Sequence, residues 1–314
     1  MANTTLSERS STPIYQSVMA IVTMIMGLLL NSFILMTFCF SKTFRKNYSN
    51  LLFSSLAFCD TVTLILYIYR FAIEELLPAP TGTFGAYYCV LVSTGYIMWA
   101  MIYNSVCHVL LITIDRYICV FFPIFYNVLV KNSVWRKCSI LAVYLTGFPS
   151  VYPYLYFSAY DHQTEKCVVV FYEQSKLFWK GLVWGFTPTV VILPFVVMYL
   201  LYGKILLFIL TRQTTSSDSQ KGANRKITKL CLLLMLEFTF CTAPDFGISV
   251  VHFVDVAYNL NINLRFDSFP AIIGIQMLYS SSALNPLIYT LQSSSFKNHF
   301  KNDVLKKFKS LLSA

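Results

Sequence analysis

Leu111-Ile112-Thr113-Ile114-Asp115-Arg116-Tyr117 is the stretch that decides the fold, because a long apolar segment ends there on an isolated pair of opposite charges. From Tyr87 to Ile114 the chain contains no Asp, Glu, Lys or Arg, and apolar residues resume directly after Tyr117. A helix of a soluble protein has little reason to end on such a pair. The stretch therefore predicts a membrane helix that reaches an aqueous surface, where a partner is bound and released.

The composition agrees with a membrane protein. The 314 residues are 56% hydrophobic and only 12% charged, whereas soluble domains are about one quarter charged. A helix needs roughly 20 apolar residues to cross the hydrocarbon core, and long blocks without alternation predict helices instead of strands. The seven blocks that are long enough are Ile14–Phe40, Asn50–Phe71, Tyr87–Phe121, Cys138–Phe157, Leu177–Leu210, Ile227–Val254 and Ser268–Leu291.

Two motifs carry a resemblance to a known family. The DRY sequence at Asp115–Tyr117 resembles the DRY motif of the rhodopsin-like G-protein-coupled receptors, and NPLIY at Asn285–Tyr289 resembles their NPxxY motif. The resemblance covers nearly the whole chain and implies an all-α membrane protein, a seven-transmembrane helix bundle with a short amphipathic eighth helix. It also implies an extracellular N-terminus at 1–13, a receptor domain at 14–291, and the eighth helix with a cytosolic tail at 292–314.

The resemblance also implies an activation switch. The segment Phe238–Pro244 resembles the family's CWxP motif with Thr242 in place of Trp, and a proline inside a helix is a natural pivot. No acid occurs between Lys221 and Leu236, so Asp115 is the expected ionic partner of Arg116. The residues expected to act in this switch and in G-protein coupling are Asp115, Arg116, Tyr117, Tyr202, Phe238, Pro244, Asn285, Pro286 and Tyr289.

The distribution of Lys and Arg predicts the orientation. With the start of the chain outside, 18 of the 24 basic residues fall on the cytosolic side, as the positive-inside rule requires. We expect a multi-pass plasma-membrane protein with an extracellular N-terminus and a cytosolic C-terminus. The net charge of +10 is then mostly a topology signal, and nucleic-acid binding is the poorer explanation. The first apolar block is too long for a cleaved signal peptide and is expected to stay as an anchor.

Two cysteines stand apart from the other seven. Only Cys89 and Cys167 fall on predicted extracellular segments, which predicts a disulfide between them. An apolar run follows Cys167 and predicts a strand or hairpin near the mouth of a pocket. Asn3-Thr4-Thr5 matches the glycosylation pattern, and an unmodified tail is the alternative.

Asp60 lies in the middle of the second apolar block, where a carboxylate costs about 2.5–3.5 kcal/mol on insertion scales. It therefore needs polar partners. By resemblance these form the family's sodium-binding cluster, because oxygen ligands suit a hard cation. The alternative is a hydrogen-bonded structural cluster without an ion. The predicted members are Asp60, Ser105, Ser281, Ser282 and Asn285.

The outer half of the third block departs from the family pattern. The segment from Cys89 to Arg116 is two residues longer than usual, which turns a helix by about 200°. We therefore expect an insertion or bulge between Cys89 and Ser105. Either Tyr96 or Met98 occupies the position where amine receptors keep an Asp, so an amine ligand is disfavoured. Gly82 and Tyr144 stand where the family usually has Trp.

A ligand pocket is expected at the extracellular end, by analogy with where the family's ligands bind. Asp245 is the strongest candidate, since a buried acid needs Arg70, a ligand cation or water as its partner. Simple packing between helices is the alternative for each aromatic residue. The candidates are Arg70, Glu74, Tyr96, Trp99, Tyr103, Asp245, Gln276 and Tyr279. A slight acidic excess outside and many aromatic residues favour a peptide ligand, with a lipid, nucleotide or chemosensory ligand as the alternative.

Other classes of membrane protein fit less well. A transporter usually shows internal repeats, and none is visible. A retinal pigment needs a lysine in the seventh block, which contains none. No nucleophile–base pair or metal motif indicates an enzyme. The resemblance implies a heterotrimeric G protein, arrestin and a receptor kinase as partners, and the basic amphipathic segment from Phe296 to Lys309 predicts contact with membrane lipid.

Overall fold

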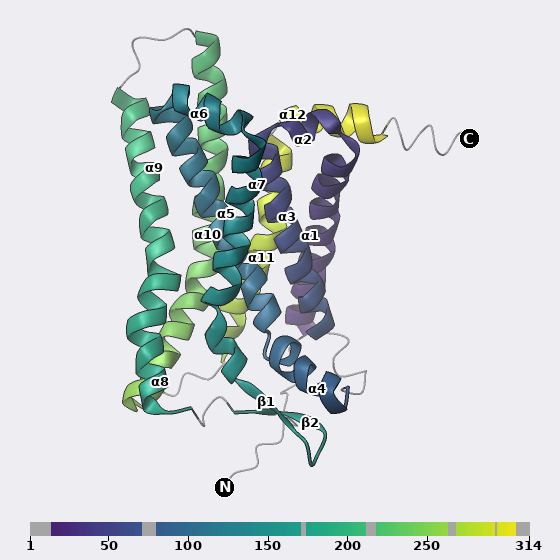
Figure 1. Cartoon of the computed structure of the whole chain (residues 1–314), viewed down its shortest axis with the longest axis vertical. Coiled ribbons are helices and arrows are strands. Elements are labelled where there is room, and N and C mark those ends of the chain that lie inside the picture. Colours follow the sequence, from purple (N-terminus) through teal and green to yellow (C-terminus); the bar gives the residue numbers. More distant parts are fainter. Residues whose placement is uncertain are drawn as a thin grey trace, which may run out of the picture.

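The computed structural model describes residues 14–70, 80–170, 174–211, 218–262, 268–292 and 294–305. The predicted glycosylation site at Asn3 and the ligand candidate Glu74 lie outside these residues. Within them, seven helical segments are long and apolar enough to cross a membrane, which confirms the predicted fold. They run side by side as one bundle (Figure 1). Their helices are α1 (Ile14–Phe40), α3 (Tyr48–Ile68), α5 (Tyr96–Phe121), α7 (Ser133–Ser150), α9 (Leu193–Thr211), α10 (Asp218–Tyr258) and α11 (Phe269–Gln292).

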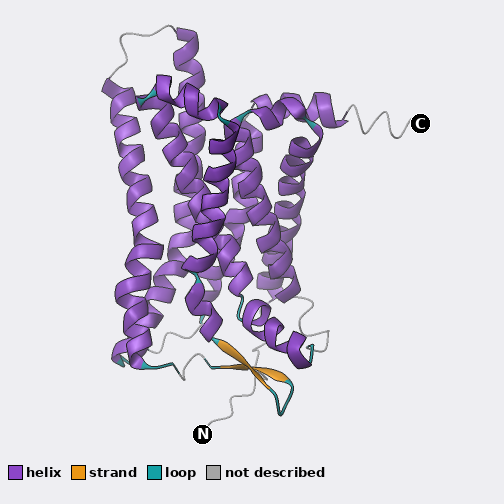
Figure 2. Ribbon diagram, viewed as in Figure 1, coloured by secondary structure: helices purple, strands orange, loops and turns teal. Residues whose placement is uncertain are grey.

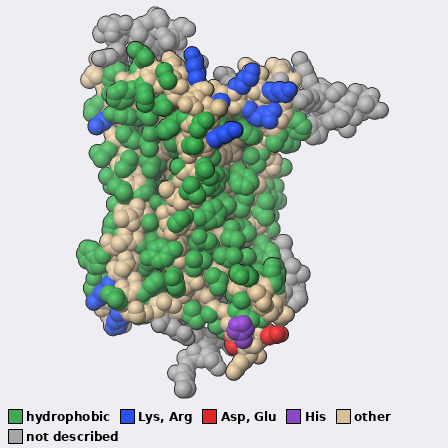
Figure 3. Space-filling model, viewed as in Figure 1, with side chains coloured by type: hydrophobic (Ala, Val, Ile, Leu, Met, Phe, Trp, Pro, Cys, Tyr) green, Lys and Arg blue, Asp and Glu red, His purple; other side chains and the backbone are tan. Residues whose placement is uncertain are grey.

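Short elements cover the two ends of the bundle (Figure 2). At one end, here called the hairpin end, lie the antiparallel strands β1 (Ser158–Asp161) and β2 (Lys166–Val169) with the helices α4 (Gly82–Tyr88) and α8 (Lys176–Gly181). At the other, here called the basic end, lie α2 (Lys42–Lys46), α6 (Pro123–Lys131) and α12 (Ser294–His299). Figure 3 shows Lys and Arg side chains gathered around α2, α6 and α12, and an apolar surface between the two ends.

The third span is interrupted where the sequence predicts a bulge. Cys89–Ser93 forms a π-helical turn, and Gly95 adopts a left-handed conformation (φ 75°) before α5 begins. A non-glycine residue would be strained in that conformation. The predicted disulfide from Cys89 to Cys167 is present and fastens β2 to this break. The predicted hairpin is therefore confirmed and held over the bundle.

The fifth and sixth spans differ in detail from the sequence prediction. Leu182–Ile192, which contains Pro188, is π-helical and leads directly into α9. Proline cannot donate a backbone hydrogen bond, so a widened turn around it is expected. Helix α10 begins at Asp218 and not at Ile227. Its polar start carries no hydrophobic signal for a span, which is why the sequence pattern missed it.

The chain after α11 turns along the basic end. Phe296 of α12 is buried and lies edge to face with Phe44 at 6.1 Å. A π-helical segment, Phe300–Leu305, continues α12, and Phe300 contacts Phe33 of α1 at 5.3 Å. These segments occupy the place of the predicted eighth helix, anchored by apolar side chains.

Candidate functional site

Arg116 lies near the basic end of α5, where it forms a buried ion pair with the neighbouring Asp115. Its Nε donates to Oδ2 of Asp115 at 2.8 Å, and Nη2 donates to the same oxygen. Adjacent residues on a helix point in different directions, so the long Arg side chain has to fold back to reach its neighbour. Charges buried this deeply are stable only while they are paired.

The same guanidinium reaches two other elements. Nη2 donates to the Ser49 hydroxyl of α3 at 2.5 Å and to the Tyr126 hydroxyl of α6 at 3.3 Å. Burial raises the pKa of the Tyr126 hydroxyl, although the charge of Arg116 acts in the opposite direction. Tyr126 is therefore a neutral acceptor at ordinary pH. One side chain thus connects three elements at the basic end.

A cavity of about 560 Å³ opens beside this ion pair. Arg116 and Tyr126 form part of its wall, and Lys46, Lys131 and Arg136 add positive charge. Such a lining suits a partner that presents negative charge or the carbonyl end of a helix.

The two predicted switch tyrosines do not hydrogen-bond to Arg116. Tyr202 on α9 is buried, and its hydroxyl has no hydrogen-bond partner among the described residues. The Tyr289 hydroxyl donates to Oδ1 of Asn50 at 2.9 Å, and its ring stacks on Phe53 at 4.2 Å. In this conformation Tyr289 therefore ties α11 to α3.

Helix α10 carries the predicted pivot. Pro244 lies inside it, so the carbonyl of Phe240, four residues earlier, lacks its helical donor. The Thr242 hydroxyl donates to the carbonyl of Phe238 at 2.7 Å. Phe238 is buried and its ring stacks with Phe195 of α9 at 6.4 Å. Thr242 therefore bonds within its own helix and does not project an aromatic ring into the core.

Tyr117 does not belong to the ion-pair cluster. Its ring packs against Phe121 at 4.6 Å, and Phe121 in turn contacts Phe208 of α9 at 4.9 Å. The third residue of the motif thus packs toward α9.

Asp60 lies at the centre of a buried polar cluster that joins α3, α5 and α11. Ser105 and Ser282 donate to its Oδ1 at 2.9 and 3.2 Å, and the Asn285 amide donates to Oδ2 at 3.2 Å. Ser281, the fifth predicted member, is buried, and its hydroxyl has no hydrogen-bond partner among the described residues. Oδ1 of Asn285 also lacks a partner there. This set of carboxylate, hydroxyl and amide oxygens fits a hard cation.

Two of the predicted ligand residues line a small cavity toward the hairpin end. Trp99 and Tyr103 of α5 face a space of about 30 Å³, close to the volume of one water molecule. A larger ligand needs the helices around it to move apart. The aromatic residues that complete this lining are Tyr154, Phe186, Phe246 and Phe253.

The other predicted aromatic and amide residues face different neighbours. The Tyr96 hydroxyl donates to the carbonyl of Phe148 on α7 at 2.9 Å. Tyr279 stacks on Tyr67 at 3.7 Å, and the Tyr67 hydroxyl donates to Gln276 at 3.4 Å. The predicted ligand residues thus separate: Trp99 and Tyr103 line the small cavity, Gln276 and Tyr279 lie between α3 and α11, and Tyr96 bonds to α7.

Asp245 is buried on α10, one residue after the predicted pivot. Its Oδ2 has no hydrogen-bond partner among the described residues, and its backbone packs against Gly274 of α11. Arg70 lies against the left-handed turn at Gly95, and no ion pair joins it to Asp245. Arg70 is therefore not the ionic partner of Asp245 that the sequence suggested.

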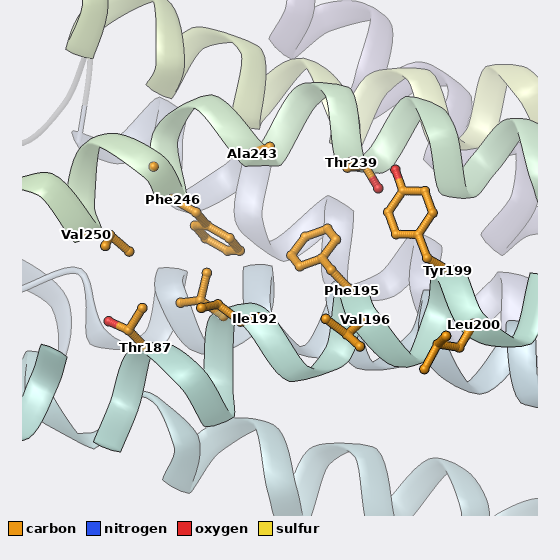
Figure 4. Close-up of a pocket in the computed structure, with 12 residues that line it drawn as sticks. Thr187, Ile192, Phe195, Val196, Tyr199, Leu200, Thr239, Ala243, Phe246 and Val250 are labelled. Atoms are coloured by element: carbon orange, nitrogen blue, oxygen red, sulfur yellow. The ribbon is translucent and has the colours of Figure 1, made fainter. Parts of the chain in front are cut away.

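A larger groove of about 650 Å³ runs between α10 and the span formed by Leu182–Ile192 and α9. In Figure 4, Phe195 and Phe246 face each other across it. Val196 and Leu200 on its rim are exposed, so the groove opens to the outside of the bundle, toward the membrane.

Glu237 is an acid inside the sixth span that was not among the predicted site residues. Both of its carboxylate oxygens are inaccessible to solvent and lack a hydrogen-bond partner among the described residues. A charge within a membrane segment is itself the signal that could have found it.

Comparison with known proteins identifies the family. Residues 30–289 match the model for the 7 transmembrane receptor (rhodopsin family). The chain is 24% identical to type-1 angiotensin II receptor A of Xenopus laevis over 77% of this chain and 65% of that protein. It is 26% identical to C5a anaphylatoxin chemotactic receptor 1 of Danio rerio over 69% of this chain and 60% of that protein. Succinate receptor 1 of Rattus norvegicus is 26% identical over 84% of this chain and 80% of its own length.

The first two of these relatives are thus matched over less than two thirds of their length. The family is one of receptors and not of enzymes. With seven spans, a buried Asp-Arg pair at the end of the third and a match over most of its length, the chain belongs to the rhodopsin family of seven-transmembrane receptors.

Proposed function

We propose that this protein is a plasma-membrane receptor that converts the binding of an extracellular ligand into activation of a heterotrimeric G protein. The observation that carries the proposal is the buried Asp115–Arg116 pair at the basic end of α5. The hairpin end is then extracellular and the basic end cytosolic, in agreement with the bias of Lys and Arg. Arrestin and a receptor kinase are further partners that membership of the family favours.

The mechanism we propose is a shift between two populated states. A ligand at the hairpin end binds the state with an open basic end more tightly, and so moves the equilibrium by that difference in affinity. Helix α10 swings about Pro244, Arg116 leaves Asp115, and Tyr202 and Tyr289 turn inward. The opened basic end then accepts a helix of the G protein, as an amphipathic helix fits a groove.

The ligand we favour is a peptide. The hairpin end offers an acidic turn with Asp161 and the exposed Glu165, and Oδ2 of the buried Asp245 has no hydrogen-bond partner among the described residues, so it could accept from a basic group of a peptide. The relatives are named for angiotensin II, for C5a anaphylatoxin and for succinate, so their names do not decide the class. A small non-amine ligand is the alternative, favoured by the small aromatic cavity beside Trp99.

We further propose that the Asp60 cluster binds sodium as an allosteric ion. Asp60, Ser105, Ser282 and Asn285 would hold it, and its positive charge would stabilise the buried carboxylate. The basic, aromatic segment from α12 to Leu305 is proposed to lie against the inner leaflet, where anionic lipids attract Lys side chains.

A screen of a neuropeptide library against the tagged receptor, read by G-protein dissociation, tests the ligand proposal. We expect at least one basic peptide to activate the wild type, and Asp245→Asn to weaken that response while surface expression is retained. Asp255→Asn, which removes an acid from the same helix while its amide oxygen can still accept from the backbone of Ile262, is the matched variant and should respond nearly as the wild type does. Activation by small molecules and by no peptide would contradict the peptide proposal and favour a small non-amine ligand.

A further inference from the structure

Glu237 is an acid of α10 with a buried carboxyl group, and the proposed activation mechanism has no use for it. Both of its oxygens are closed off from solvent, and neither has a hydrogen-bond partner among the described residues. A carboxylate in a membrane span is costly unless something compensates its charge. Such a side chain either binds a ligand or is a protonated acid that only packs against its neighbours.

The surroundings of Glu237 connect it to the Asp60 cluster. Its carboxyl lies beside the Cys241 thiol, one turn further along α10, and beside the Ser281 hydroxyl of α11, and it is within electrostatic range of Asp60. Ser281 is the member of the cluster that does not bond to Asp60. Its buried hydroxyl lies beside Glu237, and the next residue, Ser282, donates to Asp60.

The charges of this region do not balance. Asp60 accepts three hydrogen bonds, an arrangement that suits an ionised carboxylate. In the part of the chain that the structure describes, no Lys, Arg or His side chain forms an ion pair with Asp60 or Glu237. The unpartnered oxygens of Ser281 and Asn285 are both on buried residues. Two acids and two spare neutral oxygens form the ligand set of a hard cation.

We infer that Glu237 is the second carboxylate of a cation site that it shares with Asp60, Ser281 and Asn285. The ion in question is hard and oxygen-liganded, either sodium or a divalent cation such as Ca²⁺. Two carboxylates compensate a divalent charge in full, whereas sodium leaves one negative charge for a proton. The site extends the sodium cluster proposed above, and it adds a ligand from α10.

The position of Glu237 gives the site a consequence for signalling. Glu237 precedes Pro244 and therefore lies on the side of the pivot that leads to the basic end. A cation held there ties the moving half of α10 to α3 and α11. Its binding therefore opposes the swing, and this step rests on the proposed receptor function.

The test is a cation titration of the purified full-length receptor, with thermal unfolding as the readout. NaCl replaces N-methyl-D-glucamine chloride at constant ionic strength, and CaCl₂ is titrated in a separate arm. We expect one of the two salts to raise the unfolding temperature of the wild type. Glu237→Gln keeps the shape of the side chain but removes the charge, and should raise the half-effective cation concentration at least tenfold. Asp255→Asn, which removes an acid of the same helix outside the site, should keep the wild-type response.

Three outcomes decide the inference. A wild-type response in Glu237→Gln, with loss of the response in Asp60→Asn, overturns it and confines the ion to Asp60. No response of the wild type to either salt overturns the whole cation site, and ligand-free G-protein activation in the same preparation then shows that the receptor proposal stands separately. If Glu237→Gln does not fold, Glu237→Asp is used, which keeps the carboxylate but shortens the side chain. A half-effective cation concentration equal to that of the wild type in Glu237→Asp then overturns the role of Glu237.

Discussion

At the scale of single residues, the buried pair of Asp115 and Arg116 governs the basic end. Arg116 also donates to the hydroxyls of Ser49 and Tyr126. These acceptors are neutral and cannot replace the negative charge of a carboxylate. No acid on α10 reaches Arg116 among the described residues. In the proposed mechanism, one ion pair inside a single helix therefore holds the closed state at this point.

Asp115→Asn should raise ligand-free signalling severalfold. Destabilising the closed state by about 1.4 kcal/mol relative to the open state changes the ratio of the two states tenfold. Leaving Arg116 buried without its ionic partner also destabilises the fold, by about 3–5 kcal/mol in comparable buried pairs. G-protein dissociation, normalised to surface expression, measures the first effect. Asp161→Asn is the control, since its carboxylate is exposed on the hairpin. Basal signalling equal to that of the wild type would show that the pair does not hold the closed state.

At the scale of elements, the break between Cys89 and α5 determines how the hairpin end is shaped. The sequence spacing predicted an irregularity between Cys89 and Ser105, and the structure places it at the π-helical turn and Gly95. The spacing alone could not place it. Gly95, the single glycine between Cys89 and Ser105, was the signal that could have done so, because glycine is a poor helix former and tolerates a left-handed conformation.

Gly95→Ala should lower the unfolding temperature by several degrees. A left-handed conformation costs a non-glycine residue about 1–2 kcal/mol, and the added Cβ would lie 2.8 Å from the Arg70 guanidinium. Gly185→Ala is the matched control, because a Cβ there meets no atom within 4 Å. Thermal unfolding of the two purified variants is compared with that of the wild type. Equal unfolding temperatures of Gly95→Ala and Gly185→Ala would contradict strain at Gly95.

At the scale of the whole molecule, length and hydropathy were enough to predict seven spans, because lipid leaves few alternatives to helices. The motif residues were likewise predictable as a set. Their partners were not: Ser49 and Asn50 are ordinary polar residues whose roles depend on which helices lie next to each other. The ligand candidates separated for the same reason, since helix rotation decides whether Tyr96 faces a pocket or Phe148.

The orientation of the whole bundle in the membrane can be tested with epitope tags at the two ends of the chain. An epitope tag before residue 1 should be detected on intact cells, and a tag after residue 314 only after permeabilisation. Seven crossings put the two ends on opposite sides, and the bias of Lys and Arg puts the basic end in the cytosol. Detection of the C-terminal tag on intact cells would reverse the orientation and place Arg116 outside the cell.

Arg116→Ala is the most direct test of the account as a whole. Its ligand-free and agonist-stimulated G-protein activation is measured against wild type at matched surface expression, with Lys176→Ala as a control that removes an exposed cation from α8 at the hairpin end. We expect Arg116→Ala to reduce activation to the vector background and Lys176→Ala to retain most of it. Full activation by Arg116→Ala at normal surface expression would contradict the claim that this side chain couples the bundle to the G protein.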